Sequence, residues 1–174
     1  MKLVGKARKV GDDINTDYII SSRRKRDTLD GKVLAQYLME DLDTQFASTI
    51  NPGDIIVAGK NFGCGSAMEI AALVVKEAGI VAVIAESFSR NFYRNGINNG
   101  IFLIVGDTST IEGGHRIEII ADDKKFKVTD LTTGKIIACS DGLPKIMSRI
   151  LQEGGLVNYM RNYGSFKPNR TNTK

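Results

Sequence analysis

A glycine-rich loop between a buried strand and a helix constrains the fold of this chain more than any other feature. The apolar run at residues 55–58 predicts a buried strand, and residues 67–78 have the apolar spacing of a helix. A second apolar run, residues 80–84, follows within a few residues. Strand, loop, helix and strand make a βαβ unit, so the two strands are expected to be parallel and the fold to be α/β.

The remaining pattern predicts further elements around this unit. Strands are expected at residues 1–10, 101–105, 115–121, 124–129 and 135–139, and helices at residues 32–40, 87–94, 144–152 and 156–163. The helix at 87–94 is expected to end in the Asn/Gly cluster of residues 95–100. Residues 1–164 are expected to form one domain, and the polar residues 165–174 a flexible tail.

Composition indicates a globular protein of the reducing cytoplasm. No apolar run approaches the roughly 18–20 residues that span a bilayer, and the first residues lack the apolar core of a signal peptide. Two cysteines, Cys64 and Cys139, neither build a disulfide framework nor complete a four-ligand metal site. We therefore expect a cytoplasmic location, no membrane contact and no metal in this chain.

The net charge of +4 lies in the C-terminal stretch. Residues 1–139 hold 18 basic and 18 acidic side chains, whereas residues 140–174 hold 6 basic and 2 acidic ones. Aromatic residues make up only 7% of the chain, and no basic and aromatic ladder is present. General nucleic-acid binding is therefore a minor alternative.

The loop at residues 63–69, Gly-Cys-Gly-Ser-Ala-Met-Glu, favours an anionic ligand. Its glycines allow close approach of the backbone, and the start of the following helix offers free N–H groups and a positive dipole end. It is not a Walker loop, because no Gly-Lys-Ser/Thr closes it, and it is not a dinucleotide fingerprint, because Met68 stands where the third glycine is required. Ser66 has two interpretations: a capping box with Glu69, or a catalytic serine. Cys64 is more typical of a small buried residue than of a reactive thiol, although a helix start would lower its pKa.

Two further polar features have two interpretations each, and a third has one. Residues 23–26, Arg-Arg-Lys-Arg, are either a solvated charge run or a clamp for carboxylates. Arg94, with the amides of residues 91–99, either lines a polar pocket or lies at the negative end of a helix. His115 is expected to be a solvated strand residue, and no His-based triad is indicated.

Three motifs in this order carry a resemblance to a known family. They are Asp-Ile-Asn-Thr-Asp at residues 13–17, the segment at 52–66 that ends in Gly-Lys-Asn-Phe-Gly-Cys-Gly-Ser, and the segment at 84–100 that ends in Asn-Asn-Gly. Together they resemble the small subunit of 3-isopropylmalate dehydratase, the detached swivelling domain of the aconitase superfamily. Small subunits of homoaconitase and 2,3-dimethylmalate dehydratase are related. The resemblance covers roughly residues 1–155.

This resemblance implies an α/β swivelling domain of β/β/α type, with a largely parallel central sheet flanked by helices. It implies a hydro-lyase subunit of leucine biosynthesis that is inactive alone. The large-subunit partner would hold a [4Fe-4S] cluster through three cysteines. The substrate would be a malate-type di- or tricarboxylate. Ser66 matches the family's catalytic base. The residues that the resemblance and the cationic loop assign to substrate binding are Arg24, Arg26, Cys64, Gly65, Ala67 and Arg94.

The chain departs from the family where the family holds its substrate. The usual motif is Gly-Cys-Gly-Ser-Ser-Arg-Glu-His, but here Ala67, Met68 and Ile70 replace the second Ser, the Arg and the His. The loop that often reads Tyr-Leu-Arg-Thr falls on residues 24–27, where only Arg26 matches. We hypothesise that the cations have been relocated and that the substrate is another substituted malate, such as 2,3-dimethylmalate, or a homologue such as homocitrate.

Two other classes of function stay open on the sequence alone. One is a swivelling domain that binds an anion or nucleic acid without catalysis, and the other is an assembly subunit that has lost its activity. The basic C-terminal stretch is expected to contact either the partner or a second small subunit.

Overall fold

The computed structural model describes residues 1–26, 28–121, 125–141 and 144–164. Its strands are β1 (Lys2–Lys9), β2 (Ile55–Ala58), β3 (Ala82–Ala85), β4 (Phe102–Val105), β5 (Arg116–Ala121), β6 (Lys125–Asp130) and β7 (Ile136–Asp141). Its α-helices are α1 (Thr16–Ile19), α2 (Gly31–Ala35), α3 (Glu69–Glu77), α4 (Arg90–Asn99), α5 (Lys145–Gln152) and α6 (Leu156–Tyr163), with single 3₁₀ turns at Arg24–Arg26 and Ala47–Thr49. The predicted α/β class is confirmed.

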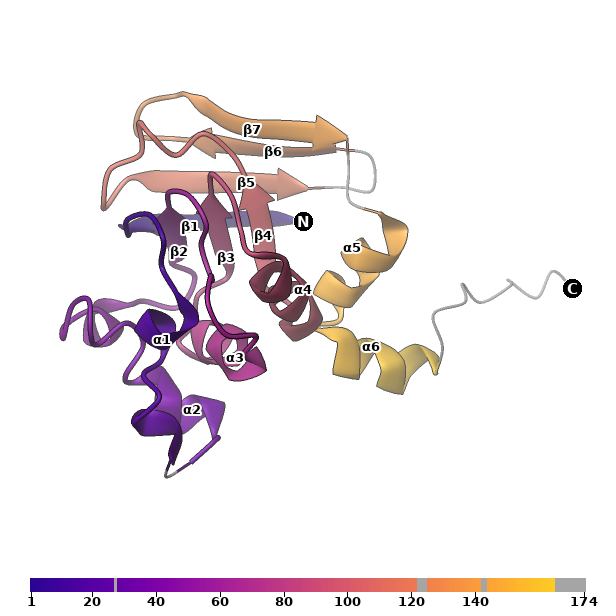
Figure 1. The fold of residues 1–174 in the computed structure, drawn as a ribbon. Coiled ribbons are helices and arrows are strands. Elements are labelled where there is room, and N and C mark those ends of the chain that lie inside the picture. Colours follow the sequence, from indigo (N-terminus) through magenta and orange to yellow (C-terminus); the bar gives the residue numbers. More distant parts are fainter. Residues whose placement is uncertain (27, 122–124, 142–143, 165–174) are drawn as a thin grey trace, which may run out of the picture.

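The strands form one mixed sheet in the order β4-β3-β2-β1-β5-β6-β7. Strands β1 to β4 are parallel, as the βαβ pattern predicts, and β5 to β7 join β1 as an antiparallel extension. The four residues of β2 are all buried, and so are those of β3, because both faces of the parallel part are covered. Figure 1 shows β5, β6 and β7 folded over on one side and α3 and α4 on the other.

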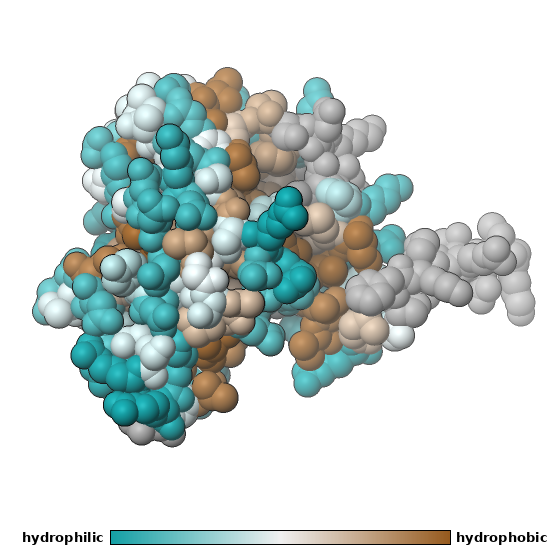
Figure 2. All heavy atoms as spheres, viewed as in Figure 1, coloured by the Kyte–Doolittle hydropathy of each residue, from teal (hydrophilic) through white to brown (hydrophobic). Residues whose placement is uncertain are grey.

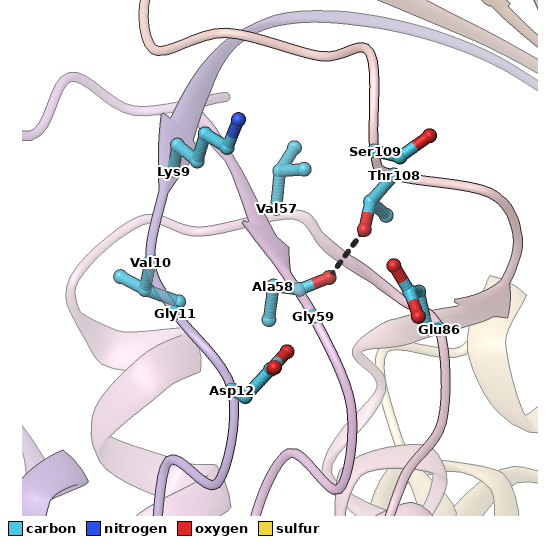
Figure 3. A pocket seen from close by; sticks show the side chains of 10 residues that line it. All are labelled: Lys9, Val10, Gly11, Asp12, Val57, Ala58, Gly59, Glu86, Thr108 and Ser109. Carbon is cyan, nitrogen blue, oxygen red and sulfur yellow. Dashed lines mark hydrogen bonds between the residues drawn. The ribbon is translucent and has the colours of Figure 1, made fainter.

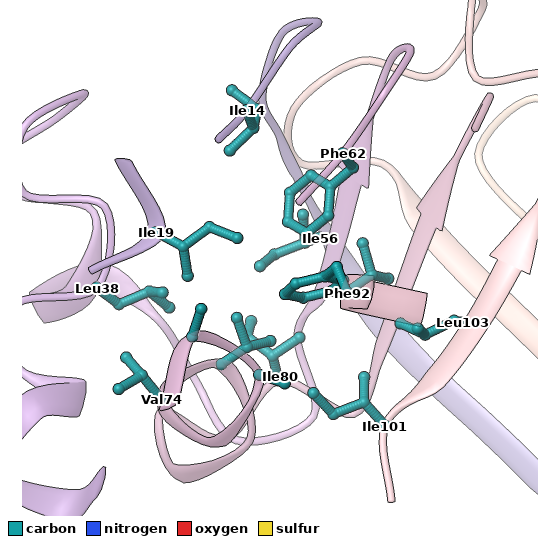
Figure 4. Packing of buried hydrophobic residues seen from close by; sticks show 14 of the residues in the cluster. Ile14, Ile19, Leu38, Ile56, Phe62, Val74, Ile80, Phe92, Ile101 and Leu103 are labelled. Atoms are coloured by element: carbon teal, nitrogen blue, oxygen red, sulfur yellow. The ribbon is translucent and has the colours of Figure 1, made fainter. Parts of the chain in front are cut away.

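Two hydrophobic cores follow from this layering. The larger one joins the helices to the parallel strands and includes Phe62, Val74 and Phe92 (Figure 4). The smaller one lies between the parallel strands and the antiparallel extension and includes Val57, Ile84 and Ile119. These residues alternate with those of the first core along the strands, since successive side chains of a strand point to opposite faces.

Three helix predictions need correction. The predicted helix at 67–78 begins only at Glu69, because Met68 is extended and occupies the N-cap position. The predicted helix at 87–94 runs instead from Arg90 to Asn99, through the Asn/Gly cluster, and ends at Gly100 in the left-handed conformation. The predicted helix at 32–40 is reduced to the short α2, followed by turns.

The expectation of a solvated His115 is wrong. Its Nδ1 lies 2.8 Å from Oδ2 of Asp130, a residue that is fully buried. The Asp130 carboxylate also accepts hydrogen bonds from Thr132 N and Thr133 Oγ1, so the pair fixes the turn between β6 and β7. The predicted tail at residues 165–174 lies outside the described residues, and the single domain over 1–164 stays a prediction.

Candidate functional site

The candidate site lies where the parallel strands end. Residues 11–16 follow β1, residues 59–68 follow β2 and residues 86–89 follow β3, so three loops meet at the carboxyl edge of the sheet. In open α/β sheets this edge is where ligands bind. The loops are joined by hydrogen bonds, including Asp13 N to Lys60 O at 2.9 Å and Phe62 N to Ser87 O at 3.0 Å. The sequence motifs at 13–17, 52–66 and 84–100 therefore converge here.

The segment 63–66 is clamped onto the chain just before α1. Gly63 N donates to Ile14 O at 2.7 Å, and Thr16 N donates to Cys64 O at 2.8 Å. Thr16, which is buried, also donates its Oγ1 proton to the carbonyl of Ser66 at 3.0 Å. The sequence did not reveal the role of Thr16, because no local pattern shows that its hydroxyl binds a residue 50 positions further along the chain. These contacts hold the backbone of the loop and leave the Ser66 side chain outside the clamp.

Gly63 is required by geometry at the base of this loop. Its φ of +76° lies in the left-handed region, and a Cβ there would overlap the ring of Phe92. Phe92 packs edge-to-face on Phe62, with ring centroids 5.0 Å apart, and both are buried. Ser89 Oγ completes the support by donating to the Gly63 carbonyl at 2.5 Å.

Ser66 lies two residues before the N-cap of α3, so the predicted capping box is wrong. Met68 is the N-cap residue and provides no side-chain hydrogen bond. Ser66 is exposed, and within the described residues its hydroxyl has no hydrogen-bond partner. The first N–H groups of α3 are consequently uncapped, which leaves both these donors and the Ser66 hydroxyl open to an anionic ligand.

Cys64 has the environment of an unreactive thiol. It is partly buried, and its backbone forms a bridge with Asn15. Burial and then the nearby Asp13 carboxylate raise the pKa of the Cys64 thiol, contrary to the lowering expected from a helix start. Residues 65–68 separate Cys64 from the start of α3, which explains why the helix does not exert that effect.

Lys25 is a cation that the structure brings from the run at 23–26 onto the end of the loop, and the sequence did not single it out. Its Nζ lies 2.7 Å from Sδ of Met68 and 3.3 Å from Oδ1 of Asp17, and its side chain is only 13% exposed. Hydrogen bonds from Ser22 and then Lys25 lower the pKa of Asp17. The run at 23–26 indicated cations here, but the sequence could not show which of the four turns inward.

The neighbouring arginines of the run have different surroundings. Arg24 Nε and Nη2 each lie 2.8 Å from a carboxylate oxygen of Glu40, and its guanidinium stacks 3.8 Å from the Tyr37 ring centroid. This ion pair keeps the pKa of Glu40 below its usual range. Arg26 is exposed, and within the described part of the chain its guanidinium has no carboxylate partner. A substrate-binding role for either residue stays a prediction, and only Arg26 has its donors open.

Arg94 lies in the middle of α4 rather than at its C-terminal end. The side chain is exposed, and Nη2 is 3.3 Å from Oδ1 of Asn91. The interpretation as a charge at the negative end of a helix is therefore wrong. Its predicted role in substrate binding is not decided by this position.

A hollow of about 230 Å³ lies nearby at the ends of β1 and β2 (Figure 3). Asp12 and Glu86 face it, and Thr108 Oγ1 closes one side by donating to Ala58 O at 2.8 Å. Asp12 also accepts from Lys60 N at 2.7 Å. Lys9 also lines the hollow, but its Nζ pairs with Oε1 of Glu112 at 3.1 Å, so the two carboxylates disfavour an anionic ligand there.

The part of the chain that the structure describes gathers no three His, Cys, Asp or Glu side chains in a position to hold a metal ion. With two cysteines in the whole sequence, the chain also lacks the three thiolates of a [4Fe-4S] site. None of the described helices is long and apolar enough to cross a membrane.

Comparisons with known proteins agree with this geometry. The family model of the aconitase C-terminal domain matches residues 16–107, which include the second and third loops and the last residue of the first. A 3-isopropylmalate dehydratase small subunit of Archaeoglobus fulgidus is 46% identical over 96% of this chain and 99% of its own length. The methanogen homoaconitase small subunit of Methanocaldococcus jannaschii is 44% identical over 92% of each chain.

A solved structure supports the same relationship. The crystal structure titled 3-isopropylmalate dehydratase (leuD) of Methanocaldococcus jannaschii superposes with a TM-score of 0.85 at 42% identity, covering 93% of this chain and 95% of that one. The fold, the loop around Ser66 and these likenesses, each over most of the chain, lead to one conclusion: the chain belongs to the aconitase C-terminal domain family, among the hydro-lyase small subunits of the 3-isopropylmalate dehydratase type.

Proposed function

We propose that this chain is the small subunit of a two-chain hydro-lyase that dehydrates and rehydrates a malate-type 2-hydroxy acid. The observation that carries the proposal is the open Ser66 hydroxyl beside the uncapped start of α3. A proton acceptor next to free N–H donors suits a substrate that carries carboxylates around a weakly acidic C–H bond. The names of the relatives, which are small subunits of such dehydratases, support the same reaction class.

The reaction divides between two chains. Dehydration breaks a C–H bond on one carbon and the C–O bond on its neighbour, and the electron pair of the C–H bond forms the double bond. We assign the proton to Ser66 Oγ, which returns it during rehydration. A [4Fe-4S] cluster, when bound in the partner subunit, supplies a Lewis acid for the hydroxyl group.

Ser66 needs positive surroundings to act as a base, because a serine alkoxide is strongly disfavoured at neutral pH. The start of α3 supplies partial positive charge, and Lys25, which contacts the N-cap residue Met68, supplies a full one. Cys64, Gly65 and Ala67, which the resemblance assigns to substrate binding, adjoin Ser66 in the same loop. In this account they orient the substrate, and Ser66 alone moves a proton.

We infer that Lys25 binds the substrate carboxylate that the family binds through an Arg at position 68. The family has Arg where this chain has Met68, and the Lys25 ammonium reaches the side chain at that same position. The cation has thus moved from the helix start to the preceding loop, as the relocation hypothesis requires. In this account the apolar Met68 side chain faces the substrate beside the compact Lys25 ammonium, where the family would present the planar guanidinium of an Arg.

Replacing Lys25 by Met is expected to raise the KM of the reconstituted enzyme roughly 10- to 100-fold with a smaller change in kcat. A charge-assisted hydrogen bond to a carboxylate contributes about 1.5–3 kcal/mol, and Lys25 holds the substrate without entering the bond changes. Steady-state kinetics measures both constants. Lys32→Met on the exposed face of α2 is the control and should change neither. An unchanged KM in Lys25→Met would remove Lys25 from the substrate site.

The substrate itself is tested with a panel of substituted malates. The relatives named for 3-isopropylmalate and for homoaconitate chemistry are almost equally similar to this chain, at 46% and 44%, so identity does not select between them. We expect the reconstituted pair to prefer a substrate other than 3-isopropylmalate, because Met68 and Lys25 replace the Arg that binds a substrate carboxylate in the family. A clear preference for 3-isopropylmalate that survives Arg26→Ala would contradict this expectation.

Three further parts of the proposal depend on the family. The role would lie in branched-chain amino-acid biosynthesis if the substrate is 3-isopropylmalate. The cytoplasmic location and an additional contact between small subunits stay predictions. Binding of the isolated chain to nucleic acid, with a steep dependence on salt, would instead favour the non-catalytic alternative.

A further inference from the structure

An apolar hollow with a positively charged rim lies on the outside of α4. It has a volume of about 370 Å³ and is lined by Ser87, Phe88, Arg90, Tyr93, Arg94 and Val105. Val105 is the last residue of β4, at the edge of the sheet, and is 58% exposed, which is unusual for the end of an otherwise buried strand. Phe88 and Tyr93 form the floor, with ring centroids 5.8 Å apart.

The rim carries two guanidinium groups that lack carboxylate partners in the described parts of the chain. Arg90 and Arg94 are both exposed and stand four positions apart on α4. Like charges at this spacing repel each other, so the pair is slightly unfavourable in the isolated chain. Figure 2 shows strongly hydrophilic side chains standing over the α4 region with hydrophobic residues close beside them. An apolar floor with open cations fits a protein surface that presents an apolar side chain next to carboxylates.

The hollow borders the loop that carries Ser66. Phe88 forms a backbone bridge with Phe62, and Ser89 donates to the carbonyl of Gly63. If the active site is divided between two chains, their contact must surround this loop to exclude water. A second copy of this chain is a poor occupant, since a symmetric contact would bring four guanidinium groups together.

We propose that this hollow is a docking site for the large subunit, which inserts an apolar side chain flanked by carboxylates. The proposal rests on the proposed function, because that function supplies the partner. It assigns Arg90, Arg94 and Val105 to association and not to the chemical step. It therefore also offers a role for Arg94 that differs from the substrate contact expected from the sequence.

The test measures the Kd of the complex with purified large subunit by titration calorimetry. Arg90→Glu/Arg94→Glu is expected to raise Kd roughly 100-fold and Val105→Asp roughly tenfold or more, and added salt is expected to weaken the wild-type complex. Ile136→Asp on β7 and Lys127→Glu on β6 are the controls and should leave Kd unchanged, since Ile136 is 53% exposed, much as Val105 is. The affected side chains are exposed, so each variant should keep the wild-type unfolding midpoint.

The outcomes separate the docking site from the proposed function. Ser66→Ala should bind the large subunit with wild-type Kd. If the variants of the hollow keep the wild-type Kd but raise KM, the hollow binds substrate, as expected for Arg94 from the sequence, and the docking proposal is overturned. If they keep both constants, the docking proposal is also overturned while the hydro-lyase function stands. If the wild-type chains do not associate at all, both proposals fail.

Discussion

Replacing Ser66 by Ala is expected to lower the kcat of the reconstituted enzyme by about 10²–10⁴-fold, the usual contribution of general acid–base catalysis. The loop itself should keep its conformation, because Thr16 binds the carbonyl of Ser66 and not its hydroxyl. The helix should also be unaffected, since Ser66 does not cap α3. The variant is therefore expected to keep the wild-type unfolding midpoint and the wild-type affinity for the large subunit.

Two measurements make this prediction decisive. Steady-state turnover of the reconstituted pair gives kcat, and a chemical unfolding curve gives stability. Ser48→Ala, which alters an exposed serine far from the loop in sequence, serves as the control and should leave kcat unchanged. Full turnover by Ser66→Ala would remove the hydroxyl from the mechanism. A large loss of stability would show that Ser66 supports the fold instead.

Replacing Gly63 by Ala is expected to destabilise the protein more than any other single change in the loop. The left-handed backbone costs an L-residue roughly 1–2 kcal/mol, and the new Cβ would overlap the buried ring of Phe92. Overpacking of a core adds roughly 1–3 kcal/mol. A total of roughly 2–5 kcal/mol is a large part of the stability of a domain of this size. The measurement is the free energy of unfolding in urea.

Gly134 provides a matched control for this prediction. It has the same φ of +76°, but a Cβ there would meet no atom within 4 Å. Gly134→Ala should therefore show only the backbone contribution, roughly 1–2 kcal/mol. Equal losses in the two variants would mean that contact with Phe92 does not hold the loop in place.

The strands and the position of the site could be predicted because they depend on local patterns. The buried strands β2 and β3 are continuous apolar runs, and the glycine-rich loop between β2 and α3 follows directly from the βαβ unit. The family resemblance then located Ser66. What could be read from the sequence was therefore the frame of the site and its candidate base.

The parts that failed depend on contacts between distant segments. The Ser66–Glu69 spacing fits a capping box, but hydrogen bonds to Ile14 and Thr16 hold the backbone of residues 63–66 outside the helix, which begins later. The Asn/Gly cluster was expected to end a helix, yet α4 continues through it because Phe92 and Ile97 are buried in the core. Tertiary packing overrode local preference at both places.

The cationic loop illustrates the same limit. The run at 23–26 is uniform in charge, so nothing local indicates that Arg24 pairs with Glu40 while Lys25 turns toward Met68. These choices depend on partners 16 and 43 positions away. The relocation of the cation stays a hypothesis from the altered motif, and the structure was needed to select Lys25 as its candidate.

The central claim is that this chain is half of a reaction centre. The most direct test is a titration of the purified chain into a fixed amount of its cluster-bearing large subunit, with turnover of a substituted malate as the readout. The account predicts no activity from either chain alone and an activity that rises with the added chain until it saturates. Turnover by this chain alone, or a mixture that stays inactive with every substituted malate, would contradict it.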